Sequence, residues 1–148
     1  MTAGSPVLAD TNILVYVTFS HFQQHDTARR RMTEFDQTAV RWWTTRQVLR
    51  EFVAVTTRPG FLTPMPPAAF VAKTVRAFED SFQMAEEDRV VTALLLEMVE
   101  KPGAQGRQVH DTNIVAAMRR HEIPYLLTNN GSDFIRYQPW ITVLPLFP

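Results

Sequence analysis

Residues 6–16 read PVLADTNILVY, in which Asp10 lies between two short apolar runs. The first run is typical of a short buried strand, and the second predicts a helix that begins just after Asp10. Ligands in open α/β sheets bind at the carboxyl ends of the strands, which is where Asp10 would lie. The tetrapeptide at 10–13, Asp-Thr-Asn-Ile, recurs at 111–114. Aspartate is a favoured helix N-cap, which would explain either one alone. Together they indicate two carboxylates delivered to helix starts from distant parts of the chain.

The composition is that of one ordinary globular domain. The chain has 148 residues, of which 45% are hydrophobic and 20% charged, with no cysteine and a net charge of zero. We therefore expect a single domain over residues 1–148, with residues 1–5 as a disordered tail, and no disulfide or thiolate metal site. No apolar run approaches the ~20 residues of a membrane span, and no export signal is visible. These features favour a cytoplasmic protein with no membrane partner.

Predicted strands and helices alternate along the chain. Strands are expected at 7–9, 40–44, 82–84, 123–128 and 141–144, and helices at 13–19, 25–35, 47–56, 68–78, 88–99 and 111–121. Turns or loops are expected at 58–67, 102–106 and 129–134. This alternation favours an α/β fold, a three-layer α/β/α sandwich with a central, mostly parallel sheet.

Four acidic residues stand at positions that such a sheet would place near the carboxyl ends of its strands. Asp10 and Asp133 follow predicted strands, and Asp111 heads the inward face of a predicted helix. Glu51 lies on the flank of an apolar helical arc, with no obvious partner four residues away. Carboxylates brought together repel one another, and their pKa values rise unless a cation binds. Oxygen ligands alone suit Mg²⁺ or Mn²⁺, which serve phosphoryl chemistry by activating water and neutralising charge.

Other chemistries are less well supported. The histidines lack the spacing of a metal-binding motif such as His-Glu-x-x-His, and no glycine-rich phosphate loop is present. His110 adjoins Asp111 and could touch a substrate phosphate, although a packing role is the favoured interpretation. A haloacid-dehalogenase-like phosphatase would need a second aspartate where Asn12 stands.

The sequence resembles the PIN domain family, and more narrowly the VapC-type toxin ribonucleases of type II toxin–antitoxin modules. The residues that carry the resemblance are 10–16, 49–52, 110–111 with 114–117, and 128–134. In the family's pattern, the four acidic positions are taken by Asp10, Glu51, Asp111 and Asp133, and the polar positions near the metal by Thr11, Asn12, Thr128 and Asn130. Thr112 departs mildly from the small apolar residue that the family often has there.

The resemblance implies a Mg²⁺- or Mn²⁺-dependent endoribonuclease that is blocked by a cognate antitoxin protein. Asp10 and Asp111 would be the primary metal ligands, with Glu51 and Asp133 completing or positioning the shell. A homodimer is expected because the apolar segments 61–62 and 144–147 are hard to cover in so small a domain. The alternatives are a PIN-fold module that binds RNA or a partner without cleaving, and a phosphatase or DNase that uses the same acids.

Overall fold

The computed structural model describes residues 1–101 and 103–148, and its centre is a five-stranded sheet. The strands lie in the order β3-β2-β1-β4-β5, and every neighbouring pair is parallel. Their bounds are β1 (Pro6–Ala9), β2 (Arg41–Thr44), β3 (Gln83–Met84), β4 (Tyr125–Thr128) and β5 (Thr142–Pro145). The predicted parallel sheet is confirmed, including the very short β3.

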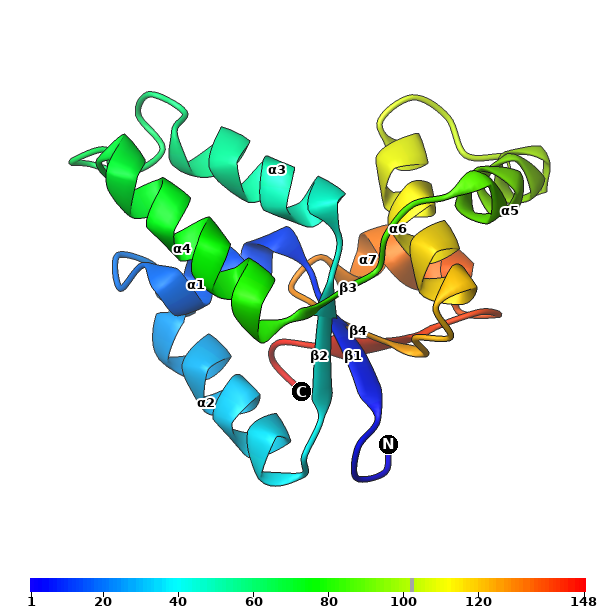
Figure 1. The fold of residues 1–148 in the computed structure, drawn as a ribbon, viewed down its shortest axis with the longest axis horizontal. Helices are drawn as coiled ribbons and strands as arrows, with labels where there is room; N and C mark the ends of the chain where they lie inside the picture. Colours follow the sequence, from blue (N-terminus) through cyan, green and yellow to red (C-terminus); the bar gives the residue numbers. More distant parts are fainter. Residues whose placement is uncertain (102) are drawn as a thin grey trace.

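Helices cover both sides of this sheet. They are α1 (Thr11–Thr18), α2 (His25–Gln37), α3 (Arg46–Thr56), α4 (Ala68–Ser81), α5 (Arg89–Glu100), α6 (Gln108–Arg120) and α7 (Gly131–Phe134), followed by the 3₁₀-helix η1 (Ile135–Tyr137). Figure 1 shows α1–α4 on one side of β1 and β2, and α5–α7 on the other. The three-layer α/β/α prediction is therefore confirmed. No helix in the described residues is long and apolar enough to cross a membrane.

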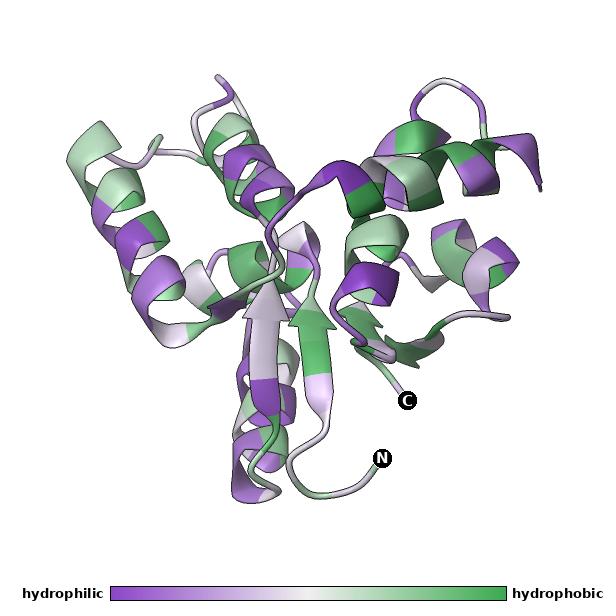
Figure 2. Ribbon diagram, turned by 45° about the vertical axis from the view of Figure 1, so that its right-hand side comes forward, coloured by the Kyte–Doolittle hydropathy of each residue, from purple (hydrophilic) through white to green (hydrophobic). Residues whose placement is uncertain are grey.

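The strand β1 lies at the centre of the sheet and of the core. Its residues pair with β2 on one edge and with β4 on the other, so that Leu8 lies opposite both Trp43 and Leu126. Val7, Leu8 and Ala9 are completely buried, and Figure 2 shows this part of β1 as hydrophobic. A parallel strand covered on both faces is apolar throughout. The apolar run before Asp10 thus has a direct structural cause.

Side-chain caps start several helices where the sequence predicts them. Thr45 Oγ1 accepts a hydrogen bond from the Val48 N–H at 3.0 Å at the start of α3. Asp88 caps α5 by accepting from the N–H groups of Val90 and Val91. These bonds satisfy backbone donors that have no partner within the helix.

Two local predictions differ from the structure, and part of a third cannot be compared with it. The helix predicted from Asp111 begins one turn earlier, at Gln108, where the Gln108 Oε1 accepts from the Gln105 N–H at 3.1 Å and so supports the approach to the helix. The polar turn predicted at 129–134 contains α7, because the Asp133 N–H donates to the Asn130 carbonyl and closes a helical turn. Pro102, part of the turn predicted at 102–106, lies outside the described residues.

The first residues are held by hydrogen bonds, although the sequence predicts a disordered tail. The Gly4 N–H donates to the Thr38 carbonyl at 3.2 Å, and the Gly4 carbonyl accepts from Arg41 Nε at 2.8 Å. Ser5 is buried and bonds back to Thr2. The backbone leading into β1 is therefore anchored to the α2–β2 connection.

A buried polar pair explains the threonine at position 112. Thr112 is completely buried, and its hydroxyl meets the hydroxyl of Tyr137, which is also completely buried. Thr112 Oγ1 also bonds to the Gln108 carbonyl at 2.7 Å. A buried phenol needs a hydrogen-bonding partner, and a small apolar residue could not supply one. This pair fixes η1, and the chain just after Asp133, against α6.

Candidate active site

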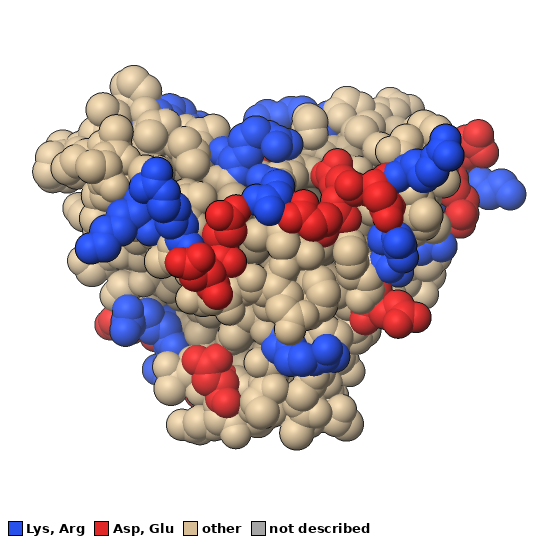
Figure 3. All heavy atoms as spheres, viewed as in Figure 1, with Lys and Arg blue, Asp and Glu red and all other residues tan. Residues whose placement is uncertain are grey.

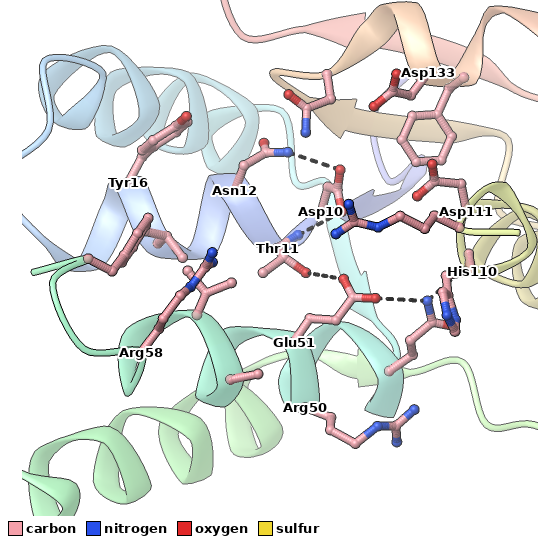
Figure 4. A pocket seen from close by; sticks show the side chains of 18 of the residues that line it. Asp10, Thr11, Asn12, Tyr16, Arg50, Glu51, Arg58, His110, Asp111 and Asp133 are labelled. Carbon is pink, nitrogen blue, oxygen red and sulfur yellow. Dashed lines mark hydrogen bonds between the residues drawn. The ribbon is translucent and has the colours of Figure 1, made fainter.

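A pocket of about 990 Å³ opens at the carboxyl edge of the sheet, and all four predicted acids line it. Asp10 comes from the end of β1, Glu51 from α3, Asp111 from α6 and Asp133 from α7. Figure 4 shows Asp10, Glu51 and Asp111 around the centre of the view, with Asp133 above them. The structure thus brings together carboxylates from four separate elements.

Asp10 is held by three donors from two elements. Its Oδ1 accepts from the Thr11 N–H at 2.8 Å, and its Oδ2 accepts from Asn12 Nδ2 at 3.0 Å and from Thr128 Oγ1 at 2.7 Å. The side chain is only 6% exposed. This burial raises the pKa of Asp10, with Glu51 adding to the rise, against the lowering effect of the three hydrogen bonds. The bonds fix the orientation of a carboxylate whose charge remains costly.

The remaining predicted polar residues connect α1 to the end of β4. Asn12 Oδ1 accepts from the Asn129 N–H at 2.9 Å, and Asn12 Nδ2 also donates to Thr128 Oγ1 at 3.2 Å. The Asn130 N–H donates to Thr128 Oγ1 at 3.0 Å, and Asn130 lines the pocket. The Thr128 hydroxyl therefore connects the β4–α7 turn to the Asp10 carboxylate by hydrogen bonds.

Asp111 has a different environment from Asp10. It lies in the first turn of α6, whose N-cap is Arg107, so it is not itself the cap. Burial is the main cause that raises the pKa of Asp111 to about 6, followed by the charges of Asp10, Asp133 and Glu51, while Arg136 opposes the rise. The capping explanation, which the sequence allows for both aspartates, therefore fails for Asp111.

Glu51 has a partner that sequence reasoning missed. Its Oε1 accepts from Gln47 Nε2 at 3.0 Å, and its Oε2 accepts from Thr11 Oγ1 at 3.0 Å. Gln47 is only 5% exposed, and Nε2 also donates to the His110 carbonyl at 3.0 Å. The signal in the sequence was that Gln47 stands four residues before Glu51, on the same face of a predicted helix.

The far end of the pocket carries aromatic and basic side chains that the sequence analysis did not assign to the site. The rings of Tyr16 and Phe22 lie 5.5 Å apart, and those of Phe22 and Phe61 lie 5.6 Å apart. The guanidinium of Arg58 lies 5.3 Å from the centre of the Phe61 ring. We call Tyr16, Phe22, Phe61 and Arg58 the aromatic arm, and all four line the pocket.

Exposed cations line the same pocket as the acids. Arg50, Arg58 and Arg107 line the pocket and are exposed, as is His110, so the favoured packing role for His110 is wrong. Some arginines elsewhere are paired, as Arg46 is with Glu79 and Glu86, and Figure 3 shows side chains of opposite charge next to one another. Within the described residues, the three pocket arginines form no ion pair.

The donor chemistry of the pocket fits a hard divalent cation. Within the part of the chain that the structure describes, no group of three or more His, Cys, Asp or Glu residues is placed to hold one metal ion. Mg²⁺, however, keeps several waters and needs only one or two carboxylates together with substrate phosphate oxygens. Asp10 and Asp111 supply such oxygens, and the raised pKa of each is the effect that a bound cation relieves.

Comparison with solved structures shows where else this fold occurs. A chain of VapBC2 from Rickettsia felis, solved with a promoter DNA fragment, is 17% identical, with a TM-score of 0.67 over 95% of this chain and 98% of that chain. VapC20 of Mycobacterium tuberculosis, a sarcin–ricin loop cleaving toxin, is 16% identical, with a TM-score of 0.62 over 81% and 86%. VapBC-1 from nontypeable Haemophilus influenzae is 13% identical, with a TM-score of 0.66 over 97% and 99%. At these identities the likeness is one of fold.

Sequence comparison agrees with the structural one. No curated protein matches the chain. Residues 7–138, however, match the PIN domain family, and this range contains all four acids as well as the aromatic arm. The chain therefore belongs to the PIN domain family.

Proposed function

We propose that the chain is a metal-dependent endoribonuclease and the toxin of a toxin–antitoxin module. The observation that carries this proposal is the meeting of Asp10, Glu51, Asp111 and Asp133 in one pocket of a PIN domain. PIN domains are generally nucleases, and VapC20, one of the structural neighbours, is a sarcin–ricin loop cleaving toxin. A binding module that does not cleave would have no evident need for such costly acids.

The proposed mechanism assigns a role to each acid. Asp10 and Asp111 would hold Mg²⁺ or Mn²⁺, and Glu51 and Asp133 would complete or position the shell. When bound, the cation supplies activation of water and neutralisation of the charge on the phosphate. Thr11, Asn12 and Thr128 hold the Asp10 carboxylate in one orientation. Asp111 must lose its proton to bind a cation, and cation binding itself favours that loss.

The aromatic arm and the pocket arginines support RNA as the substrate. Single-stranded nucleic acid binds to grooves that combine cations for the phosphates with aromatic rings for the bases. Arg50, Arg58 and Arg107 would contact phosphates, and the Phe61 ring, which is 36% exposed, offers a surface for stacking. A phosphatase acting on small phosphomonoesters would have no use for so long a lining.

The proposal includes two protein partners. Several structural neighbours are toxin–antitoxin complexes, which supports an antitoxin that blocks this pocket. The expected homodimer is less well supported, because Leu62 and Leu146, two of the residues that suggested it, are buried within the chain. Only Phe61 and Phe147 of those segments remain as exposed large hydrophobic side chains.

Cleavage of a structured RNA in Mn²⁺ tests the proposed function. The purified chain, free of any partner, is incubated with the RNA, with a DNA of the same sequence and with a phosphomonoester. We expect cleavage of the RNA only, with loss in EDTA and in Asp111→Asn. RNA binding without cleavage would favour the binding module, and hydrolysis of the DNA or the phosphomonoester would favour the DNase or the phosphatase.

A further inference from the structure

A short chain of amide hydrogen bonds links the two walls of the pocket. Gln47 on α3 donates through Nε2 to Glu51 Oε1 and to the His110 carbonyl, both at 3.0 Å. Its Oε1 accepts from Asn113 Nδ2 on α6 at 3.1 Å. Asn113 Nδ2 also donates to Glu87 Oε1 at 2.7 Å. Figure 4 shows the bond between Glu51 and this amide beside His110.

The chemistry of the partners leaves only one orientation for Gln47. A carboxylate and a backbone carbonyl can only accept hydrogen bonds, so the Gln47 NH₂ group must face Glu51 and His110. Its oxygen is then left for Asn113, whose NH₂ group has two acceptors in Gln47 and Glu87. Every polar atom of the Gln47 amide is thus used, which is the arrangement that makes a buried polar network rigid.

The two helices joined by Gln47 otherwise belong to different packing groups. α3 packs against α1 and α4, whereas α6 packs mainly against α5. Figure 1 shows α3 with α1 and α4 on one side of β1 and β2, and α6 with α5 on the other. One of the groups bound by Gln47, the His110 carbonyl, belongs to the peptide bond that joins His110 to Asp111. The amide therefore connects the carboxylate of Glu51 with the backbone that carries Asp111.

We propose that Gln47, anchored by Asn113, is a positioning residue that holds Glu51 and the start of α6 at a set separation for cation binding. This inference rests on the proposed function, because it assumes that the acids bind a divalent cation. Gln47 is not a ligand in this scheme: by joining Glu51 to the start of α6, it acts on the cation through the Glu51 carboxylate. Groups that orient metal ligands in this way typically contribute 10–100-fold to metal affinity.

The test measures the dissociation constant of Mn²⁺ in the absence of RNA. Mn²⁺ is titrated into the protein, and electron paramagnetic resonance monitors its binding. We compare the wild-type chain with Gln47→Met, which keeps the length of the side chain and removes its hydrogen bonds. We expect Gln47→Met to weaken Mn²⁺ binding by about tenfold or more. Gln37→Met, at the exposed end of α2, is the matched control and should bind as the wild type does.

A double-mutant cycle separates positioning from a general loss of stability. If Gln47 acts through Glu51, then Gln47→Met should change the dissociation constant by less than about threefold in a Glu51→Gln background. An equal loss in both backgrounds, or wild-type affinity in Gln47→Met, overturns the inference. Asn113→Ala provides a second route if Gln47→Met does not fold, and it should show the same dependence on Glu51.

The failure of this inference differs from the failure of the proposed nuclease. A wild-type chain that binds Mn²⁺ but leaves RNA intact refutes nuclease activity, while the cycle still decides the role of Gln47. A chain that cleaves RNA but shows no coupling between Gln47 and Glu51 refutes only the positioning role. A wild-type chain that binds no Mn²⁺ refutes both.

Discussion

Asp10 and Asp111 occupy copies of the same tetrapeptide, yet their carboxylates have different surroundings. Asp10 is almost completely buried and accepts hydrogen bonds from Thr11, Asn12 and Thr128. Asp111 is half-buried, and no hydrogen bond contributes to its pKa, which is raised by burial and by neighbouring carboxylates. The same substitution therefore has different consequences at the two positions.

We expect Asp111→Asn to stabilise the metal-free protein at neutral and higher pH. The pKa of Asp111 is about 6 in the folded protein, against an ordinary value of 3.8. In the pH window between these two values, the native state therefore binds more protons than the unfolded state. The free energy of unfolding of the wild type should fall as pH rises through the window, and the loss is complete above it. Asp111→Asn should recover about 1–2 kcal/mol there, after allowance for solvent screening.

Melting curves in EDTA at about pH 5 and about pH 8 measure this effect. The stabilisation by Asp111→Asn should be larger at the higher pH, where the wild-type carboxylate is ionised. Asp26→Asn, in the exposed first turn of α2, should show no such gain. An equal change at both pH values for Asp111→Asn would contradict the raised pKa.

For Asp10→Asn we expect nearly unchanged stability together with loss of RNA cleavage. Asparagine is as good an N-cap as aspartate, and the variant removes a buried charge. In the variant, the asparagine NH₂ group takes the place of Oδ2. Because an NH₂ group cannot accept a hydrogen bond, the bond from Asn12 Nδ2 is lost, which opposes this gain. The two effects oppose each other, so the net change should lie within about 1 kcal/mol. A folded Asp10→Asn that cleaves at the wild-type rate in Mn²⁺ would refute the proposed mechanism.

At the level of elements, local pattern was enough to predict the strands and most helices. The apolar run in β1, the cap at Thr45 and the cap at Asp88 each depend on neighbours in sequence. The start of α6 could not be read from Asp111, because that aspartate resembled the true cap at Asp10. The Gln47 network could not be predicted either, since its partners Glu51, His110 and Asn113 are brought together only by the tertiary fold.

The pair formed by Thr112 and Tyr137 allows a prediction about how η1 is held to α6. Thr112→Val keeps the shape of the side chain but leaves the buried Tyr137 hydroxyl without this partner. Loss of one partner from a buried hydrogen bond costs about 1–3 kcal/mol. Tyr137→Phe removes the orphaned hydroxyl. The double variant should therefore lose less free energy of unfolding than the sum of the losses in the two single variants. Urea unfolding of the four proteins measures this coupling, and strictly additive losses would contradict it.

Across the whole molecule, a net charge of zero conceals exposed cations that line the pocket beside its acids. Arg46 and Arg120 are paired with carboxylates at the surface, and Figure 3 shows basic and acidic side chains next to one another on one face of the molecule. Arg50, Arg58 and Arg107 instead line the pocket beside the acids. Net charge alone was therefore a poor guide to a nucleic-acid partner, because it does not show that three exposed arginines line the pocket.

We expect Arg58→Gln to weaken RNA binding and to reduce its dependence on salt. Each phosphate contact that is lost should lower the slope of log K against log salt by about 0.7 for a single strand. Binding is measured in EDTA, where cleavage is prevented, over a range of salt concentrations. Arg29→Gln, on the exposed surface of α2, is the control and should leave the slope unchanged. A wild-type slope in Arg58→Gln would contradict a phosphate contact at Arg58.

The central position of β1 also has a consequence for the order of events during synthesis. One edge of β1 pairs with β2, which follows early in the chain, but the other pairs with β4, which leaves the ribosome more than a hundred residues later. A nascent chain that has not reached Tyr125 holds β1 with one edge unpaired. Asp133 is made later still. The pocket therefore cannot be complete until residue 133 has been made, and its assembly depends on a long-range strand pairing that forms late in synthesis.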